Sequence, residues 1–261
     1  MKTLIVSDIH SNFAALRAIL TKEESIDHII CLGDVVQGGP EPERVLSLLS
    51  SYKGSFILGN HDEEMLNVVQ GRSPWDSRML AWLQDRGLQD TFDKWMEWES
   101  KQISESGCEF LNSFKETLSI NCQELRIRLC HGHLWDYSLL PDSPMDRFEA
   151  LSNLYPEPYI FFGHFHIQFR KSLSGTVFLN PGTVGGDYRL GHSDACYGII
   201  EDGKVYLKSA PYPVDEYCEK MKQVPIDQHF NRAFQESYRK GMSLPAFRIK
   251  DLTYLKGMGC R

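Results

Sequence analysis

Five short apolar runs, each followed at once by side chains that are able to bind a metal ion, constrain this chain more than any other feature. A single motif of this kind is weak, because Asn and Asp also suit turns. Five repeats ask for a common explanation. The pairs are residues 4–6 before Asp8 and His10, 29–32 before Gly33 and Asp34, 55–58 before Gly59, Asn60, His61 and Asp62, 127–130 before His131, and 159–162 before Gly163, His164 and His166.

The first three apolar runs alternate with amphipathic helical patterns. Ser11 or Asn12 is able to cap a helix that runs to Leu20, and Pro42 suits the first turn of the next helix. A β-α-β-α-β order predicts a parallel sheet with right-handed crossovers, and ligands bind beyond the carboxyl ends of such strands. We therefore expect five polar side chains to meet at that edge: Asp8, His10, Asp34, Asn60 and His61.

The second half of the chain predicts local strand pairing. Short loops at positions 123–124, 174–175 and 202–203 separate alternating apolar runs, which is typical of hairpins. A helix is expected from Ser143 and Pro144 to about Asn153. A parallel half is therefore expected to join an antiparallel half. The predicted strands of the hairpins are residues 117–122 with 125–130, 167–171 with 176–180, and 195–201 with 205–209.

Two segments depart from this pattern. Residues 63–115 are rich in helix formers and tryptophan, which predicts two or three helices. They form either an insertion that leans over the mouth of the site or a layer that covers one sheet face, and the tryptophans are interpreted as core rather than as a base-stacking platform. We expect one catalytic domain over residues 1–210, with the insertion at about 63–115, and a partly helical C-terminal extension over 211–261.

The charge and the cysteines limit the class of protein. A net charge of −7 gives no electrostatic footprint for nucleic acid or an anionic membrane. The chain starts directly in a predicted strand, with no signal peptide and no apolar run long enough to span a bilayer. Its seven cysteines form no CxxC pair and indicate reduced thiols, so we expect a cytoplasmic protein.

The candidate metal ligands carry carboxylate, imidazole and amide groups and no thiolate. Such a set suits Mn, Fe, Zn, Co or Ni rather than a structural cysteine-zinc site. Seven ligands exceed what one ion needs, whereas two ions that share a bridging carboxylate would use them all. Asp34 is the expected bridge because it follows the middle strand. The seven ligands are Asp8, His10, Asp34, Asn60, His131, His164 and His166.

A dinuclear centre of this kind predicts phosphoester chemistry. Two ions about 3.5–4 Å apart polarise a phosphoryl oxygen and generate hydroxide near neutral pH. We expect this metal-bound hydroxide to attack phosphorus in line, with no covalent enzyme intermediate. His61 is not needed as a ligand, and it is placed to protonate the leaving alkoxide.

The motifs DxH, GD, GNHD, HG and GHxH, in this order, resemble the calcineurin-like metallophosphoesterase superfamily, and most closely its bacterial and archaeal branch of small phosphodiesterases and phosphatases. The resemblance spans residues 4–186, in which residues 180–185 are similar to the family's NPGS-type loop. It implies an α/β (α+β) fold, a four-layer α-β-β-α sandwich with two facing mixed sheets.

The resemblance also implies how the ligands are shared between the ions. One ion would be bound by Asp8, His10, Asp34 and His166, and the other by Asp34, Asn60, His131 and His164. Within this pattern Asp34 is catalytic as the bridge, and His61 acts as general acid or stabilises the transition state.

Two departures from the family's patterns bear on the substrate. Family members that act on phosphoproteins or symmetrical dinucleoside tetraphosphates carry GDxxDRG, whereas residues 33–39 lack that arginine. The phosphoprotein phosphatases also carry GNHE, where this chain has Asp62. Phosphoproteins and symmetrical dinucleoside tetraphosphates are therefore not the favoured substrates. Phe165 stands where threonine is commoner and is expected to change only the local wall of the site.

Other polar residues near the motifs are given more ordinary roles. His133 and Arg189 are the candidate substrate contacts, with a site-rim group and a solvated loop as their alternatives. Asp62 is expected to cap a helix or support a ligand rather than to bind metal. The remaining histidines are interpreted as core or rim residues: His28, His192 and His229.

We therefore predict a cytoplasmic phosphoesterase with two divalent or trivalent metal ions, manganese favoured, that hydrolyses a phosphodiester or a phosphomonoester. Its substrate is a small phosphate ester or nucleotide-type molecule, bound between the site and the 63–115 segment. One alternative is a protein-binding scaffold, as in a retromer subunit of this superfamily that lacks the key histidine, which is present here as His61. The other is a metal- or nucleotide-sensing module without useful turnover.

Overall fold

Two five-stranded sheets form the centre of the molecule in the computed structural model, which describes residues 1–135, 138–186, 192–226 and 228–241. The first sheet has the order β10-β9-β1-β2-β3. Its parallel part, β1 to β3, is the one that the sequence predicts. The strands are β1 (Lys2–Val6), β2 (His28–Cys31), β3 (Gly54–Phe56), β9 (Ala195–Glu201) and β10 (Lys204–Ala210).

The second sheet has the order β4-β5-β6-β8-β7. All three predicted hairpins form, but β6 pairs in parallel with both β5 and β8. The third hairpin, β9 and β10, joins the first sheet instead. The prediction of a purely antiparallel second half is therefore wrong, because sequence spacing shows only which strands form hairpins. The strands are β4 (Thr117–Cys122), β5 (Leu125–Cys130), β6 (Tyr159–Phe161), β7 (Phe169–Leu173) and β8 (Thr176–Asn180).

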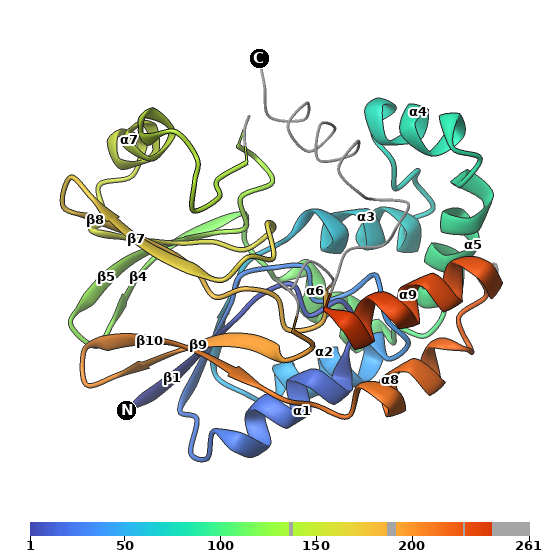
Figure 1. Cartoon of the computed structure of the whole chain (residues 1–261), viewed down its shortest axis with the longest axis horizontal. Coiled ribbons are helices and arrows are strands. Elements are labelled where there is room, and N and C mark those ends of the chain that lie inside the picture. The colour runs from blue at the N-terminus through green and yellow to red at the C-terminus, as the bar shows by residue number, and fades with distance from the viewer. Residues whose placement is uncertain (136–137, 187–191, 227, 242–261) are drawn as a thin grey trace.

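Three apolar clusters separate four layers (Figure 1). The largest lies between the first sheet and a helical layer that includes α1 (Phe13–Lys22) and α2 (Pro42–Ser50). A second cluster lies between the two sheets, and a third lies between the second sheet and α7 (Met145–Leu154). The four-layer α-β-β-α sandwich with two facing mixed sheets is confirmed.

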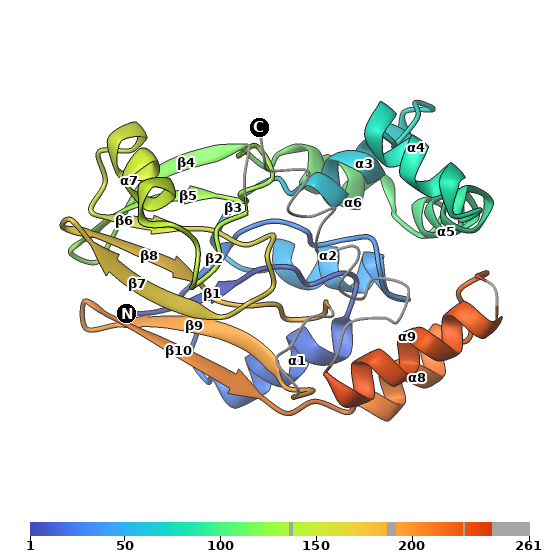
Figure 2. The same ribbon diagram turned by 45° about the horizontal axis from the view of Figure 1, so that its top comes forward.

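Four helices, rather than two or three, occupy the tryptophan-rich segment. They gather at one end of the molecule beside the C-terminal helices (Figure 2). Trp95 is 3% exposed and meets Phe234 of the C-terminal segment with ring centroids 5.3 Å apart, so these residues form core as expected. The proposed domain limits stay a prediction. The helices are α3 (Asn60–Val69), α4 (Ser77–Asp85), α5 (Gln89–Ser100), α6 (Glu105–Asn112), α8 (Val214–Met221) and α9 (Gln228–Lys240).

The helices of the described ranges are short and amphipathic, and none of them is long and apolar enough to cross a bilayer. Local capping explains where several begin. The Asn12 side chain accepts a hydrogen bond from the backbone N–H of Ala15 and starts α1, as the sequence predicts. The helix then packs against the parallel strands, which leaves the strand ends open on one edge.

Candidate metal centre

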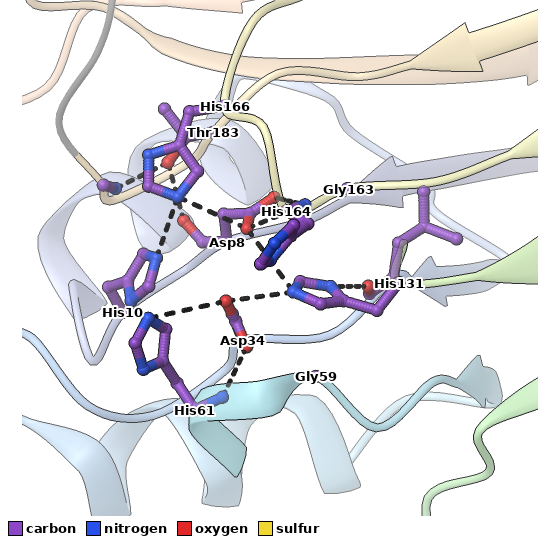
Figure 3. Close-up of polar contacts among 12 residues, drawn as sticks. Asp8, His10, Asp34, Gly59, His61, His131, Gly163, His164, His166 and Thr183 are labelled. Carbon is purple, nitrogen blue, oxygen red and sulfur yellow. Dashed lines mark hydrogen bonds and ion pairs between the residues drawn. The ribbon is translucent and has the colours of Figure 1, made fainter. Parts of the chain in front are cut away.

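Six of the seven predicted ligands and His61 gather at one edge of the two sheets (Figure 3), and the seventh, Asn60, lies at the start of α3. Those of the first sheet follow β1, β2 and β3 directly, and those of the second sheet follow β5 and β6. Two groups have ligand atoms that all lie within 4.8 Å of one another. The groups are Asp8 with His10 and His166, and Asp34 with His131 and His164.

These groups divide as the two predicted ligand sets do, apart from Asp34 and Asn60. Asp34 lies between His61 and His131 (Figure 3), with its Oδ2 atom 3.0 Å from His131 Nε2. Asn60 begins α3 at the mouth of the site and lies beside the second group. Which ligand binds which ion stays a prediction.

Five of the seven candidate ligands have left-handed backbone conformations. Asp8, His10, Asp34, His164 and His166 have φ angles between +50° and +68°. This region is uncommon for residues other than glycine, although Asp and His tolerate it better than most. Strained residues persist where the surrounding structure fixes them, typically at functional sites. The sequence analysis did not predict these left-handed conformations.

Glycine is required beside the ligands for a different reason, close approach. A Cβ atom on Gly59 would lie 2.1 Å from Asp34 Oδ1, and one on Gly163 would lie 1.8 Å from Ser7 Oγ. Neither position has room for a side chain. The glycines of the GNHD and GHFH motifs therefore let the loops of the two sheets pack against the carboxylate-bearing loops.

Several ring nitrogens and one amide oxygen are left with lone pairs that face the centre. His131 Nδ1 donates to the carbonyl of Leu32 over 2.6 Å, so Nε2 is the atom that faces Asp34, and it offers a lone pair there whenever the ring is neutral. Asn60 Oδ1 is buried without a hydrogen-bond donor. Acceptors that face one another require a cation between them. The donor set therefore fits divalent metal ions of borderline hardness.

The electrostatics also favour a bound cation. Burial alone would raise the pKa of Asp8 and Asp34, but His166 and His131 hold both pKa values below the usual range. Burial opposes the charge of His131, yet Asp34 raises its pKa to about 9. Burial lowers the pKa of His164 to about 3. A protonated His131 balances part of the negative charge of Asp8 and Asp34, whereas His164 stays neutral. A bound cation would balance the rest.

His61 is oriented by two neighbours that the sequence analysis missed. Its Nδ1 atom lies 2.7 Å from Gln37 Oε1 and 2.9 Å from Glu64 Oε2, which leaves Nε2 facing Asp34 Oδ2 at 4.0 Å. Burial disfavours its charged form, but Asp34 and Glu64 raise its pKa to about 9. The ring is therefore held with one nitrogen towards the site and is able to carry a proton there.

Asp62 binds backbone rather than the metal site. Its Oδ1 atom accepts from the N–H groups of Val35 and Val36, and its Oδ2 atom accepts from Gly59 N over 3.0 Å. The side chain therefore joins the start of α3 to the loop that carries Asp34. This agrees with the expected role as a cap that supports a ligand.

Glu99 of α5 was also missed. Its buried carboxylate accepts from Ser11 Oγ, from Gln37 N over 2.7 Å and from Gly38 N over 3.4 Å. It thereby joins the tryptophan-rich segment to the two loops that carry His10 and Asp34. No pattern predicts this, because an acid on a helix normally faces solvent.

A pocket of about 390 Å³ opens beside the centre, between the starts of α3 and α4 and the loops after β5 and β6. Asn60, His133 and His164 form part of its lining. His133 thus lies in the wall of the site, and the other predicted substrate contact, Arg189, lies outside the described residues. The pocket lies where the sequence analysis expects the substrate.

The other histidines keep their ordinary interpretations as far as they are described. His28 lies on β2 with its Nε2 atom 3.2 Å from Ser55 Oγ, and His192 is exposed. The side chain of His229 is outside the described part of the chain.

Comparison with known sequences places the chain among phosphoesterases. The calcineurin-like phosphoesterase superfamily domain matches residues 1–202. The uncharacterized protein MJ0912 of Methanocaldococcus jannaschii is 29% identical over 245 residues, which cover 83% of this chain and 90% of that protein. The symmetrical bis(5′-nucleosyl)-tetraphosphatase of Legionella pneumophila (strain Lens) is 29% identical over 147 residues, which cover 53% of this chain and 48% of that enzyme.

The fold is shared with a metallophosphoesterase from Sphaerobacter thermophilus. That structure superposes with a TM-score of 0.69 at 22% identity and covers 93% of this chain and 99% of its own. The sequence match extends over the strand ends that carry all seven candidate ligands and His61. The chain therefore belongs to the calcineurin-like phosphoesterase superfamily and is a metal-dependent hydrolase of phosphate esters.

Proposed function

We propose that the chain uses two divalent metal ions, held by the seven candidate ligands, to hydrolyse a small phosphodiester or phosphomonoester of the nucleotide type. The observation that carries the proposal is the meeting of two three-residue ligand groups whose free lone pairs face one another. When bound, such a pair of ions polarises a phosphoryl oxygen and lowers the pKa of a water molecule to near neutrality. Mn²⁺ is the ion that we propose first.

His61 supplies a proton in this proposal. With Nδ1 held by Gln37 and Glu64, its Nε2 atom is the one that faces the reacting centre. A proton held at Nε2 is available to the leaving oxygen, which otherwise departs as an alkoxide. Asp34 belongs to the second ligand group and would be the carboxylate that the two ions share.

The compartment that we propose is the cytoplasm. None of the six cysteines among the described residues forms a disulfide, and five of them are buried. Burial raises the pKa of the Cys31 and Cys130 thiols, to about 12 for Cys130, so neither is a reactive thiolate near pH 7. Free thiols suit a reducing compartment.

The test is turnover of a chromogenic phosphodiester and its matching monoester by metal-stripped protein that has been reloaded with Mn²⁺. Hydrolysis that requires Mn²⁺ is expected for at least one ester, and the ratio of the two rates gives the preferred class. If two ions are bound and neither ester is hydrolysed, the proposal fails in favour of a sensing module without turnover. His61→Ala provides the comparison for background hydrolysis.

A further inference from the structure

The pocket beside the metal centre has an aromatic wall. Trp135 and Phe165 both line it, with ring centroids 6.5 Å apart and planes inclined by 30°. The rings are half-buried, and the backbone of Gly132, which has no side chain, lies between them. Such a surface stacks against a planar ring, and a stacked base contributes about 1–3 kcal/mol in single-stranded nucleic-acid sites.

The wall is continuous with the metal ligands. Phe165 lies between His164 and His166 in the chain, and its ring centroid is 4.7 Å from that of His164. Trp135 follows His131 by four residues and packs edge-on against Phe162, the residue after β6, with centroids 5.0 Å apart. A planar group stacked on this wall is therefore within reach of a phosphate at the centre.

The opposite side of the pocket is acidic. Glu63, Glu64 and Asp76 line it, and Arg78 is the one Lys or Arg among its described lining residues. Arg78 lies 3.7 Å from the carboxylate of Asp76, and His61 Nδ1 lies 2.9 Å from that of Glu64. These two carboxylates are therefore partly balanced, and Glu63 carries the rest of the acidic charge. A chain of several phosphates placed there would meet like charges, which costs free energy unless cations intervene.

We propose that this pocket binds the uncharged nucleoside part of a substrate that carries a single phosphate, and that it disfavours a polyphosphate chain. The inference rests on the proposed function and names its substrate class. The aromatic wall stacks the base, and Asn67, Ser73 and Glu63 offer polar groups to the sugar and base edges. The metal centre takes the one phosphate.

The first test compares two diesters with the same leaving group, thymidine 5′-(p-nitrophenyl phosphate) and methyl p-nitrophenyl phosphate. The Mn²⁺-loaded protein should have a kcat/KM at least about 10-fold higher for the nucleoside ester, as one stacked base predicts. Trp135→Ala should remove most of that ratio. Tyr206→Ala, which changes an exposed aromatic residue on β10, should leave the ratio unchanged. Equal kcat/KM values for the two esters would overturn the inference while leaving the proposed function standing.

The second test concerns charge. Bis(5′-adenosyl) tetraphosphate should be a poorer substrate than the thymidine ester, by about 10-fold or more in kcat/KM, and Glu63→Lys should narrow that gap. Glu24→Lys, an exposed acid beyond α1, is the matched control and should leave the gap as it is. If the tetraphosphate is the better substrate of the wild-type protein, the inference is wrong.

A binding measurement keeps the inference testable if no ester is hydrolysed. Titration calorimetry on Mn²⁺-loaded protein compares 5′-deoxyadenosine 5′-phosphonate, which has no ester bond, with methylphosphonate. The nucleoside phosphonate should bind about 10-fold tighter or more, and Trp135→Ala should remove the difference. Equal affinities in the wild-type protein would overturn the inference.

Discussion

The Nε2 atoms of His10 and His166 lie 3.2 Å apart, at the tips of loops from the two different sheets. His10 Nδ1 is 2.7 Å from the carbonyl of Gln37 and donates to it, so its Nε2 atom carries a lone pair. A second lone pair at this distance repels it unless a proton or a metal ion lies between the rings. In the metal-free protein a proton on His166 Nε2 makes this contact a hydrogen bond, and a bound metal ion would take the place of that proton.

Added Mn²⁺ should stabilise the metal-stripped protein. Binding to the folded state alone stabilises it by about 2.7 kcal/mol at 100 times the dissociation constant. Protons compete for the same imidazoles, so the gain in Tm should shrink from pH 7.5 to pH 5. Thermal unfolding with and without MnCl₂ at the two pH values measures this. An equal Tm with and without the ion at pH 7.5 would contradict a metal site at His10 and His166.

Asp34→Asn should weaken the binding of both ions. Asp34 Oδ2 is 3.0 Å from His131 Nε2, and its Oδ1 atom accepts from His61 N over 2.9 Å, so both carboxylate oxygens are held in place. An amide removes one negative charge and one shared oxygen. Elemental analysis after dialysis should give fewer than two ions per chain. Asp90→Asn on α5, an exposed acid, is the control, and two retained ions in Asp34→Asn would argue against a bridge.

His61→Ala should keep both ions and lose most turnover, by about 10²–10⁴-fold in kcat if the ring is the general acid. Its ring is anchored through Nδ1 by Gln37 and Glu64 and is not one of the seven candidate ligands, so metal content should stay at the wild-type level. Steady-state kinetics on a chromogenic ester and metal analysis of the same sample test both statements. His28→Ala on β2 serves as the control histidine. An unchanged kcat would remove His61 from the mechanism.

Much of this site could be predicted because its residues follow strand ends. The carboxyl ends of parallel strands meet at one edge, so Asp8, Asp34 and Asn60 were expected together from position alone. The ligands of the second sheet, such as His131, were expected because each follows an apolar run, and only the division of the ligands between two ions came from the family resemblance. Nothing in the spacing of the second half shows that β6 would pair in parallel with β5 and β8.

The groups that support the ligands could not be predicted, because their roles depend on long-range packing. Gln37 and Glu64 orient His61 only after the loop that follows β2 and the start of α3 have met. The left-handed backbone conformation of His164 depends on how the loop after β6 packs and not on the residue type. The tryptophans were expected to be core. Their positions in the sequence did not show which helix of the 63–115 segment would lie beside the site.

Glu99 provides the last prediction, because it is a buried acid that joins α5 to the ligand loops. Burial raises its pKa from an ordinary value near 4.5 to about 7, despite hydrogen bonds from Ser11 and Gln37. A raised pKa means that the folded state binds the proton more tightly than the unfolded state. The stability contributed by this proton is present in full below pH 4.5 and is lost as the pH rises through about 7.

Glu99→Gln should therefore flatten the pH dependence of unfolding. The free energy of unfolding of the wild type should fall relative to that of the variant between pH 4.5 and pH 7.5, by at most about 3 kcal/mol. Urea unfolding of metal-stripped protein across this range measures the difference without pH-dependent metal binding. Glu97→Gln in the same helix is the control, since Glu97 is exposed and pairs with Lys101. If the free energies of unfolding of wild type and Glu99→Gln differed by the same amount at every pH, Glu99 would titrate normally. In that case α5 would not be joined to the ligand loops by a protonated side chain.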